Sequence, residues 1–148
     1  MKILIICSRR FYERIPEIKK SLENNGHIVL LPNCYDEPET EVKMWNLGKE
    51  KHQEFKAKMY RQSEDVIKNM DAVLVLNYDK EKEGKVYKNY IGGATFLEMY
   101  DAFRYEKQIF LMNDIPKGIL YDEIEGFGPI ILNGNLEFIY NQKKKLLK

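Results

Sequence analysis

The sequence predicts an α/β fold in which one doubly wound, five-stranded parallel sheet carries helices on both faces. The chain has 148 residues, which suits a single domain over residues 1–148. Short apolar runs alternate with longer segments in which apolar residues recur at helical spacing. Strands that alternate with helices in this way indicate parallel βαβ units with right-handed crossovers.

The first three elements are predicted to be a strand, a helix and a strand. Lys2–Cys7 is a continuous, largely β-branched apolar run, which is typical of a buried strand. The helix over 11–26 ends at Gly26, a good C-cap, and Pro16 fits its first turn. His27–Pro32 is the second strand. The apolar positions of the helix are Phe11, Ile15, Ile18 and Leu22.

The middle of the chain is predicted to hold a polar loop over 33–45, a long helix over 46–70 and a third strand over 71–78. A charged, solvated loop follows over 79–89. An apolar stripe on the long helix is expected to face the protein interior, with packing across a dimer axis as the alternative. The stripe consists of Trp45, His52, Phe55, Met59, Val66 and Met70.

The last third is predicted to hold a helix over 93–105, a strand over 108–113, a turn with a short helix over 114–127 and a strand over 128–134. The tail reads as a frayed helix whose lysines form a solvated end. Five strands in this order suggest a flavodoxin-like sheet, where ligands bind at the carboxyl ends of the strands. That rule selects the loops after Cys7, Leu76 and Met112.

Net charge, hydrophobicity and the absence of known motifs argue against several classes of function. The net charge of +1 argues against nucleic acid or anionic lipid as a partner. No apolar run approaches the ~20 residues that span a bilayer, and the N-terminal run is too short for a signal peptide, so a soluble cytoplasmic protein is expected. Cys7 and Cys34 form no zinc motif and are expected to be reduced, and neither GxGxxG nor a P-loop is present. No metal or cofactor is expected.

The loop after the first strand is a candidate anion site. Ser8, Arg9 and Arg10 lie between the end of a strand and the start of a helix, where a phosphate or carboxylate is stabilised. Exposed loop charges are the alternative. Phosphatase chemistry through Cys7 is disfavoured, because Arg14 comes one position too late and the loop lacks glycines.

Glu98 is the candidate catalytic acid. Gly92 and Gly93, just before its helix, would let a ligand approach the backbone closely. Small side chains on the face of Glu98 leave room around the carboxylate, whereas a solvent-exposed helix acid is the alternative. The small neighbours are Ala94, Thr95 and Ala102.

The strand, charged loop, glycine turn and "ATFLE" segment resemble the nucleoside 2-deoxyribosyltransferase superfamily, which includes the deoxynucleoside 5′-monophosphate N-glycosidases. "GHIVLLP", Asp71 before "AVLVLN" and "KQIFLMND" agree in order and spacing, so the similarity covers roughly residues 2–115. The resemblance implies that Glu98 is a nucleophile that cleaves an N-glycosidic bond, by hydrolysis or transfer. It also implies a nucleotide or nucleoside as substrate and a homodimer or higher homo-oligomer.

The resemblance also assigns substrate-binding residues. It implies that Ser8, with Arg9 or Arg10, holds a 5′-phosphate. An acid ahead of the third strand lies near the sugar in this superfamily; a gapless count lands on Ser63, and the neighbouring Asp65 is preferred over Glu64.

Two family positions are altered here. The family acid that handles the leaving base is replaced by Gly92, with Asn89 as the nearest polar substitute, and a family glycine is replaced by Ala94. Asn113 and Asp114, at the end of the fourth strand, are expected to reach a ligand in the same subunit or in a neighbouring one. A non-catalytic nucleotide-binding module is therefore the second candidate function, and a protein-interaction domain with a Tyr-rich surface is the third.

Overall fold

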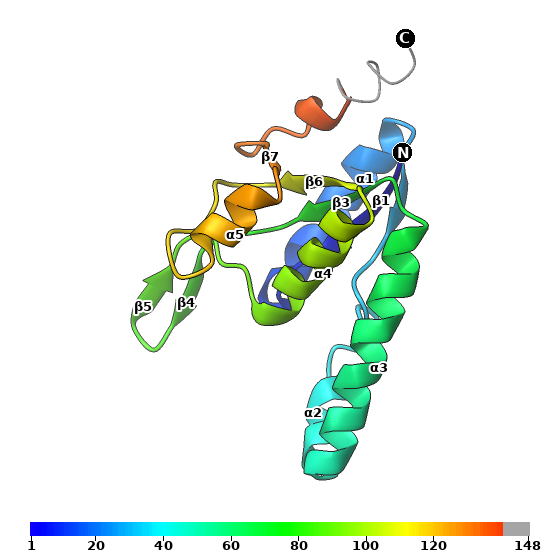
Figure 1. The fold of residues 1–148 in the computed structure, drawn as a ribbon, viewed down its shortest axis with the longest axis vertical. Coiled ribbons are helices and arrows are strands. Elements are labelled where there is room, and N and C mark those ends of the chain that lie inside the picture. Colours follow the sequence, from blue (N-terminus) through cyan, green and yellow to red (C-terminus); the bar gives the residue numbers. More distant parts are fainter. Residues whose placement is uncertain (141–148) are drawn as a thin grey trace.

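The computed structural model describes residues 1–140 and confirms the predicted sheet. Five strands, all parallel, lie in the order β2-β1-β3-β6-β7 (Figure 1). Because β1 lies between β2 and β3, the strand order reverses beside it, as in a doubly wound sheet. The strands are β1 Lys2–Ile6, β2 Ile28–Leu30, β3 Ala72–Val75, β6 Gln108–Leu111 and β7 Ile130–Ile131.

Alternate residues of the central strands enter two separate cores, one on each face of the sheet. Ile3 and Leu74 pack with α1 (Ile15–Asn24) and with Ile139 near the end of the described chain. Leu4 and Val73 pack on the other face. That face is covered by α3 (Lys49–Lys68), α4 (Gly93–Arg104) and α5 (Tyr121–Gly126).

The region predicted as a polar loop over 33–45 contains a helix, so that part of the prediction is wrong. This helix, α2 (Thr40–Asn46), packs on the N-terminal half of α3, and the pair projects away from the sheet (Figure 1). The predicted interior stripe is therefore only partly correct. Met70 is buried against the sheet, whereas Trp45 is 61% exposed and contacts only the ring of His52 among aromatic neighbours.

The predicted charged loop contains a β-hairpin, formed by β4 (Lys80–Lys82) and β5 (Lys85–Tyr87). Glu83 and Gly84 at its tip have φ of 53° and 76°, which is the backbone of a type I′ hairpin turn. The strands were not predicted because they are largely Lys and Glu, which are poor strand formers.

The chain ends its described part with a helical turn over 137–140. The short 3-10 helix η1 (Arg9–Arg14) directly follows β1. The predicted lysine-rich helix end falls on residues 141–148, outside the described residues. Within residues 1–140, no helix combines the length and the apolar character that crossing a membrane requires.

Candidate active site

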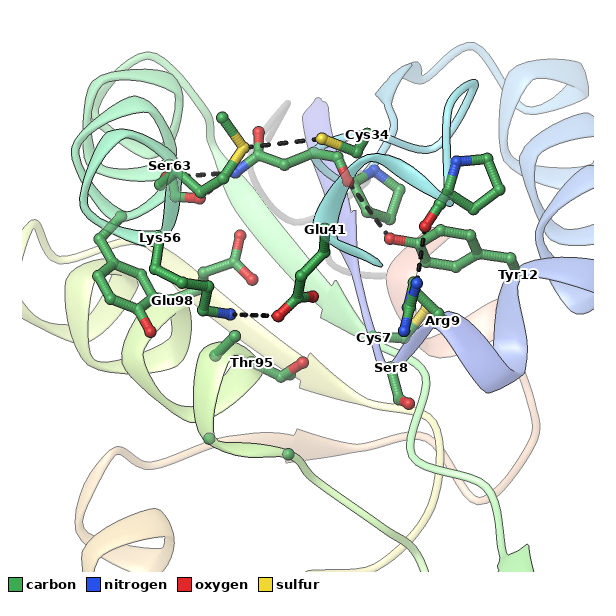
Figure 2. A pocket seen from close by; sticks show the side chains of 18 of the residues that line it. Cys7, Ser8, Arg9, Tyr12, Cys34, Glu41, Lys56, Ser63, Thr95 and Glu98 are labelled. Carbon is green, nitrogen blue, oxygen red and sulfur yellow. Dashed lines mark hydrogen bonds and ion pairs between the residues drawn. The ribbon is translucent and has the colours of Figure 1, made fainter. Parts of the chain in front are cut away.

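A pocket of about 260 Å³ opens at the carboxyl end of β1 (Figure 2). Four segments form its walls: the β1–η1 connection, the chain between β2 and α2, one side of α3, and the start of α4. These segments meet because β1 is flanked by β2 and β3, and both of those strands release the chain at the same edge of the sheet. The pocket thus occupies the place that the sequence predicts.

Glu98 enters this pocket from α4. The buried side chains of Thr95, Met99 and Ala102 fix α4 on the sheet, and Glu98 lies beside them, half-buried. Burial raises the pKa of Glu98 from 4.5 to about 7, although a hydrogen bond from Ser63 works in the opposite direction. The carboxyl group therefore exchanges its proton near neutral pH.

Ser63, on α3, is held by the side chain of Asn33. Asn33 Nδ2 donates to Ser63 Oγ at 2.6 Å and to the carbonyl of Met59 at 3.3 Å. Gln62 Nε2 donates to Asn33 Oδ1 at 3.3 Å, which fixes the amide in this orientation. Since Ser63 Oγ already accepts from Asn33, its own hydrogen is available for Glu98.

The two arginines after β1 have different surroundings. Arg9 lines the pocket and donates from Nη1 to the carbonyl of Pro38 at 2.7 Å. Arg10 points away, toward the hairpin, where its Nη1 donates to the carbonyl of Glu81 at 3.1 Å. Ser8 lines the pocket beside Arg9, so the pocket has a hydroxyl and a guanidinium at the end of β1.

An ion pair between α2 and α3 also lies in the pocket. Lys56 Nζ is 3.4 Å from Glu41 Oε1, and His52 Nε2 is 3.3 Å from the same oxygen. Burial by itself would raise the pKa of Glu41, but Lys56 and His52 lower it below 4.5. Glu41 is therefore ionised at neutral pH, whereas Glu98 titrates near it.

The thiols and the phenol in the pocket keep their protons. Burial and the nearby Glu98 raise the pKa of Cys7 to about 12. Burial and two glutamates raise the pKa of Cys34, and burial also raises that of Tyr12. Neither thiol is therefore a nucleophile at neutral pH. No three His, Cys, Asp or Glu side chains within residues 1–140 form a group that could hold a metal ion.

The structure brings together five of the residues selected from the sequence. These five line the pocket: Ser8, Arg9, Gly92, Gly93 and Glu98. The other four lie elsewhere. Arg10 contacts the hairpin, and Asp65 is exposed on the outer side of α3. Asn89 donates its backbone N–H to Asp79 Oδ1 at 3.0 Å, and Asn113 Nδ2 donates to the carbonyl of Asn77 at 3.1 Å.

Ser63, Glu41 and Lys56 are among the pocket residues that were not selected from the sequence. A gapless count against the superfamily that the sequence resembles lands on Ser63, so a signal for it existed, but the neighbouring acid was preferred. Glu41 and Lys56 gave no signal, because they meet only through the packing of α2 on α3. In the sequence, Glu41 and Lys56 cannot be distinguished from ordinary solvent-exposed charged residues.

No protein-family model matches the chain, and no curated protein matches it. A function for this protein must therefore be argued from the chemistry of its pocket. The pocket supplies one carboxyl group that titrates near pH 7, one ionised carboxylate, two cations and several hydroxyl groups.

Proposed function

We propose that this protein cleaves the N-glycosidic bond of a nucleotide or nucleoside, with Glu98 as the nucleophile. The observation that supports this most directly is the position of Glu98, which is half-buried in a pocket that also contains Ser8 and Arg9. A carboxylate in such a place can meet an electron-poor carbon, while the opposite end of the same ligand is held as an anion.

The reaction follows from the charge that develops when the bond breaks. The C1′–N bond leaves its electron pair on the base, and positive charge grows at C1′. Ionised Glu98 stabilises that charge or bonds to C1′ as a glycosyl ester. Water then gives hydrolysis, or a second base gives transfer, and Glu98 is released. Two displacements at one carbon retain its configuration.

Arg9 and Ser8 support a 5′-monophosphate as the anionic end of the substrate. One N–H of Arg9 is used on the carbonyl of Pro38, and the guanidinium has four more to offer. Charge-assisted hydrogen bonds from guanidinium to phosphate are among the stronger polar contacts in proteins. A free nucleoside would leave this end of the pocket unfilled.

The test is release of free base from a panel of deoxynucleoside and ribonucleoside 5′-monophosphates, followed by chromatography. The wild-type protein is expected to release base from at least one of them, and Glu98→Gln and Glu98→Ala to release none. Glu54→Gln is the matched control, since Glu54 is exposed on α3 outside the pocket. Failure of the wild-type protein on the whole panel would overturn the proposal.

Gly92 favours a second candidate, a module of the same fold that binds a nucleotide without cleaving it. The position lacks any side chain that could protonate a leaving base. Such a module would be stabilised by its ligand without consuming it, by about 2.7 kcal/mol at ~100 times Kd. Thermal unfolding with each monophosphate, together with base analysis of the same samples, separates the two functions.

A further inference from the structure

Cleavage of an N-glycosidic bond requires, besides the nucleophile, a group that assists the departing base. The inference below rests on the proposed function. The departing base carries the electron pair of the broken bond, so a hydrogen-bond or proton donor accelerates its departure. Glu98 cannot fill both roles in one step, because it attacks C1′ as an anion. Gly92 offers no donor.

Three pocket side chains, Tyr12, Cys34 and Glu41, are already engaged in other contacts. The Tyr12 hydroxyl donates to the carbonyl of Asn33 at 3.3 Å, and Cys34 Sγ donates to Met59 Sδ at 3.7 Å. Glu41 is held as an anion by Lys56 and His52, so it accepts hydrogen bonds and has no proton to give.

Lys56 differs from these groups in having donors to spare. Its ammonium carries three N–H bonds, and only Glu41 lies within ion-pair distance of it, at 3.4 Å. The side chain reaches from α3 into the pocket, where its Nζ lies beside Glu41 (Figure 2). Its positive charge is also felt by Glu98. The side chain is only 27% exposed, and partial burial strengthens the effect of a charge.

We propose that Lys56 is the group that handles the leaving base, and that Glu41 positions its ammonium for this role. As the C1′–N bond breaks, the electron pair moves to the base nitrogen, which takes a proton from Lys56 Nζ. Glu98 bonds to C1′ in the same step. The attacking water then gives one proton to neutral Lys56 and its hydroxyl to C1′, which restores both side chains. The balance is one water consumed and one protonated base released.

The test compares two substrates whose leaving groups differ in their need for a proton. One is the deoxynucleoside 5′-monophosphate that the wild-type protein cleaves fastest. The other is 4-nitrophenyl 2-deoxyribofuranoside 5-phosphate, whose nitrophenolate leaves as a stable anion. Rates are measured at about pH 9, where Glu98 is ionised in every variant that retains it.

Lys56→Met is expected to slow the natural substrate by about 100-fold or more and the nitrophenyl substrate by less than about fivefold. Glu41→Gln is expected to show the same preference with a smaller loss. Glu98→Gln should abolish cleavage of both substrates. Lys58→Met is the matched control, because Lys58 is exposed on α3 outside this pocket, and both rates should stay at the wild-type level.

Equal losses on the two substrates in Lys56→Met would overturn the role of Lys56 and leave the role of Glu98 standing. The same conclusion follows if Lys56→Met cleaves the natural substrate at the wild-type rate. A wild-type protein that cleaves neither substrate would overturn the proposed function, and the role of Lys56 with it.

Discussion

Ser63 on α3 lies beside Glu98 on α4, where its hydroxyl lowers the pKa of the Glu98 carboxyl group, and Ser63 Oγ accepts a hydrogen bond from Asn33 at 2.6 Å. This contact joins two helices that come from distant parts of the sequence. The Ser63 hydroxyl favours the ionised form of Glu98, whereas burial favours the neutral form. The balance of the two sets the pH at which Glu98 ionises.

Ser63→Ala is expected to move the pH dependence of base release upward. Loss of the hydrogen bond removes a group that stabilises ionised Glu98, so its pKa rises further above 4.5. The measurement is the initial rate of base release between about pH 5 and 9. Asp65→Ala, two residues along the same helix, should leave the profile in place. An unshifted profile in Ser63→Ala would show that the contact has no influence on the reactive carboxyl group.

The wild-type rate itself should rise with pH through about 7, because the proposed nucleophile is ionised Glu98 and its pKa is raised to about 7. Below that pH the carboxyl group is protonated and kcat/KM falls tenfold per pH unit. The rate is best followed with a saturating and a limiting substrate concentration, so that free enzyme and complex are distinguished. A rate that is flat between about pH 5 and 8 would contradict the raised pKa.

Glu98→Gln should stabilise the folded protein at high pH. A carboxyl group whose folded pKa is raised binds more protons in the folded state, so folding stability falls as pH rises from about 4.5 to about 7. Above pH 7 the ionised, half-buried group costs about 3 kcal/mol, which the neutral amide avoids. Urea unfolding at about pH 5 and 8 should show a gain at the higher pH alone. Equal stability of both proteins at both pH values would argue that Glu98 is solvated.

Arg9→Ala should separate nucleotides from nucleosides. Loss of a charged hydrogen-bond donor to phosphate costs about 1.5–3 kcal/mol, so KM for a 5′-monophosphate should rise roughly 10- to 100-fold. KM for the corresponding nucleoside should change less than about threefold, since it offers no phosphate to Arg9. Arg10→Ala is the control, because Arg10 contacts the hairpin instead of the pocket. An equal rise for both substrates would point to a loosened Pro38 segment rather than a phosphate site.

Phe110→Ala should destabilise the fold by about 3–5 kcal/mol, since Phe110 is fully buried in the core under α1 and the cavity it leaves cannot collapse. Leu47→Ala, at a side chain that is 67% exposed after α2, should change stability by less than about 0.5 kcal/mol. Urea unfolding of the two variants beside the wild-type protein measures both values. A small loss in Phe110→Ala would mean that the core is looser than the packing shows.

The strands of the sheet could be predicted because their apolar residues pack into a core on each of its two faces. Ile3 and Ile5 serve one core while Leu4 and Ile6 serve the other, so an uninterrupted apolar run has no other stable place in a domain of this size. Helix α2 could not be predicted in this way. None of its residues is buried, and no side chain caps it, so it forms through its packing on α3.

The sequence was enough to predict at which strand ends the site lies. It was not enough to predict which side chains of a helix face the pocket. Ser63 is buried beside Glu98 and Asp65 is exposed, although they are two residues apart, because each step along a helix turns the side chain by about 100°. A loose motif that is uncertain by one or two positions cannot distinguish such neighbours. The same applies to Arg9 and Arg10, which are adjacent yet contact different parts of the fold.

The hairpin has a consequence for how this protein can vary. The hairpin lies between Tyr78 and Tyr90, and these two residues are joined by a hydrogen bond of 2.8 Å from the N–H of Tyr90 to the carbonyl of Tyr78. Because this hydrogen bond closes the base of the hairpin, the residues between Tyr78 and Tyr90 can change in length and sequence while the two ends stay in place. Engineered versions could lengthen, shorten or replace this segment, and Gly92 and Gly93 would keep their place in the wall of the pocket.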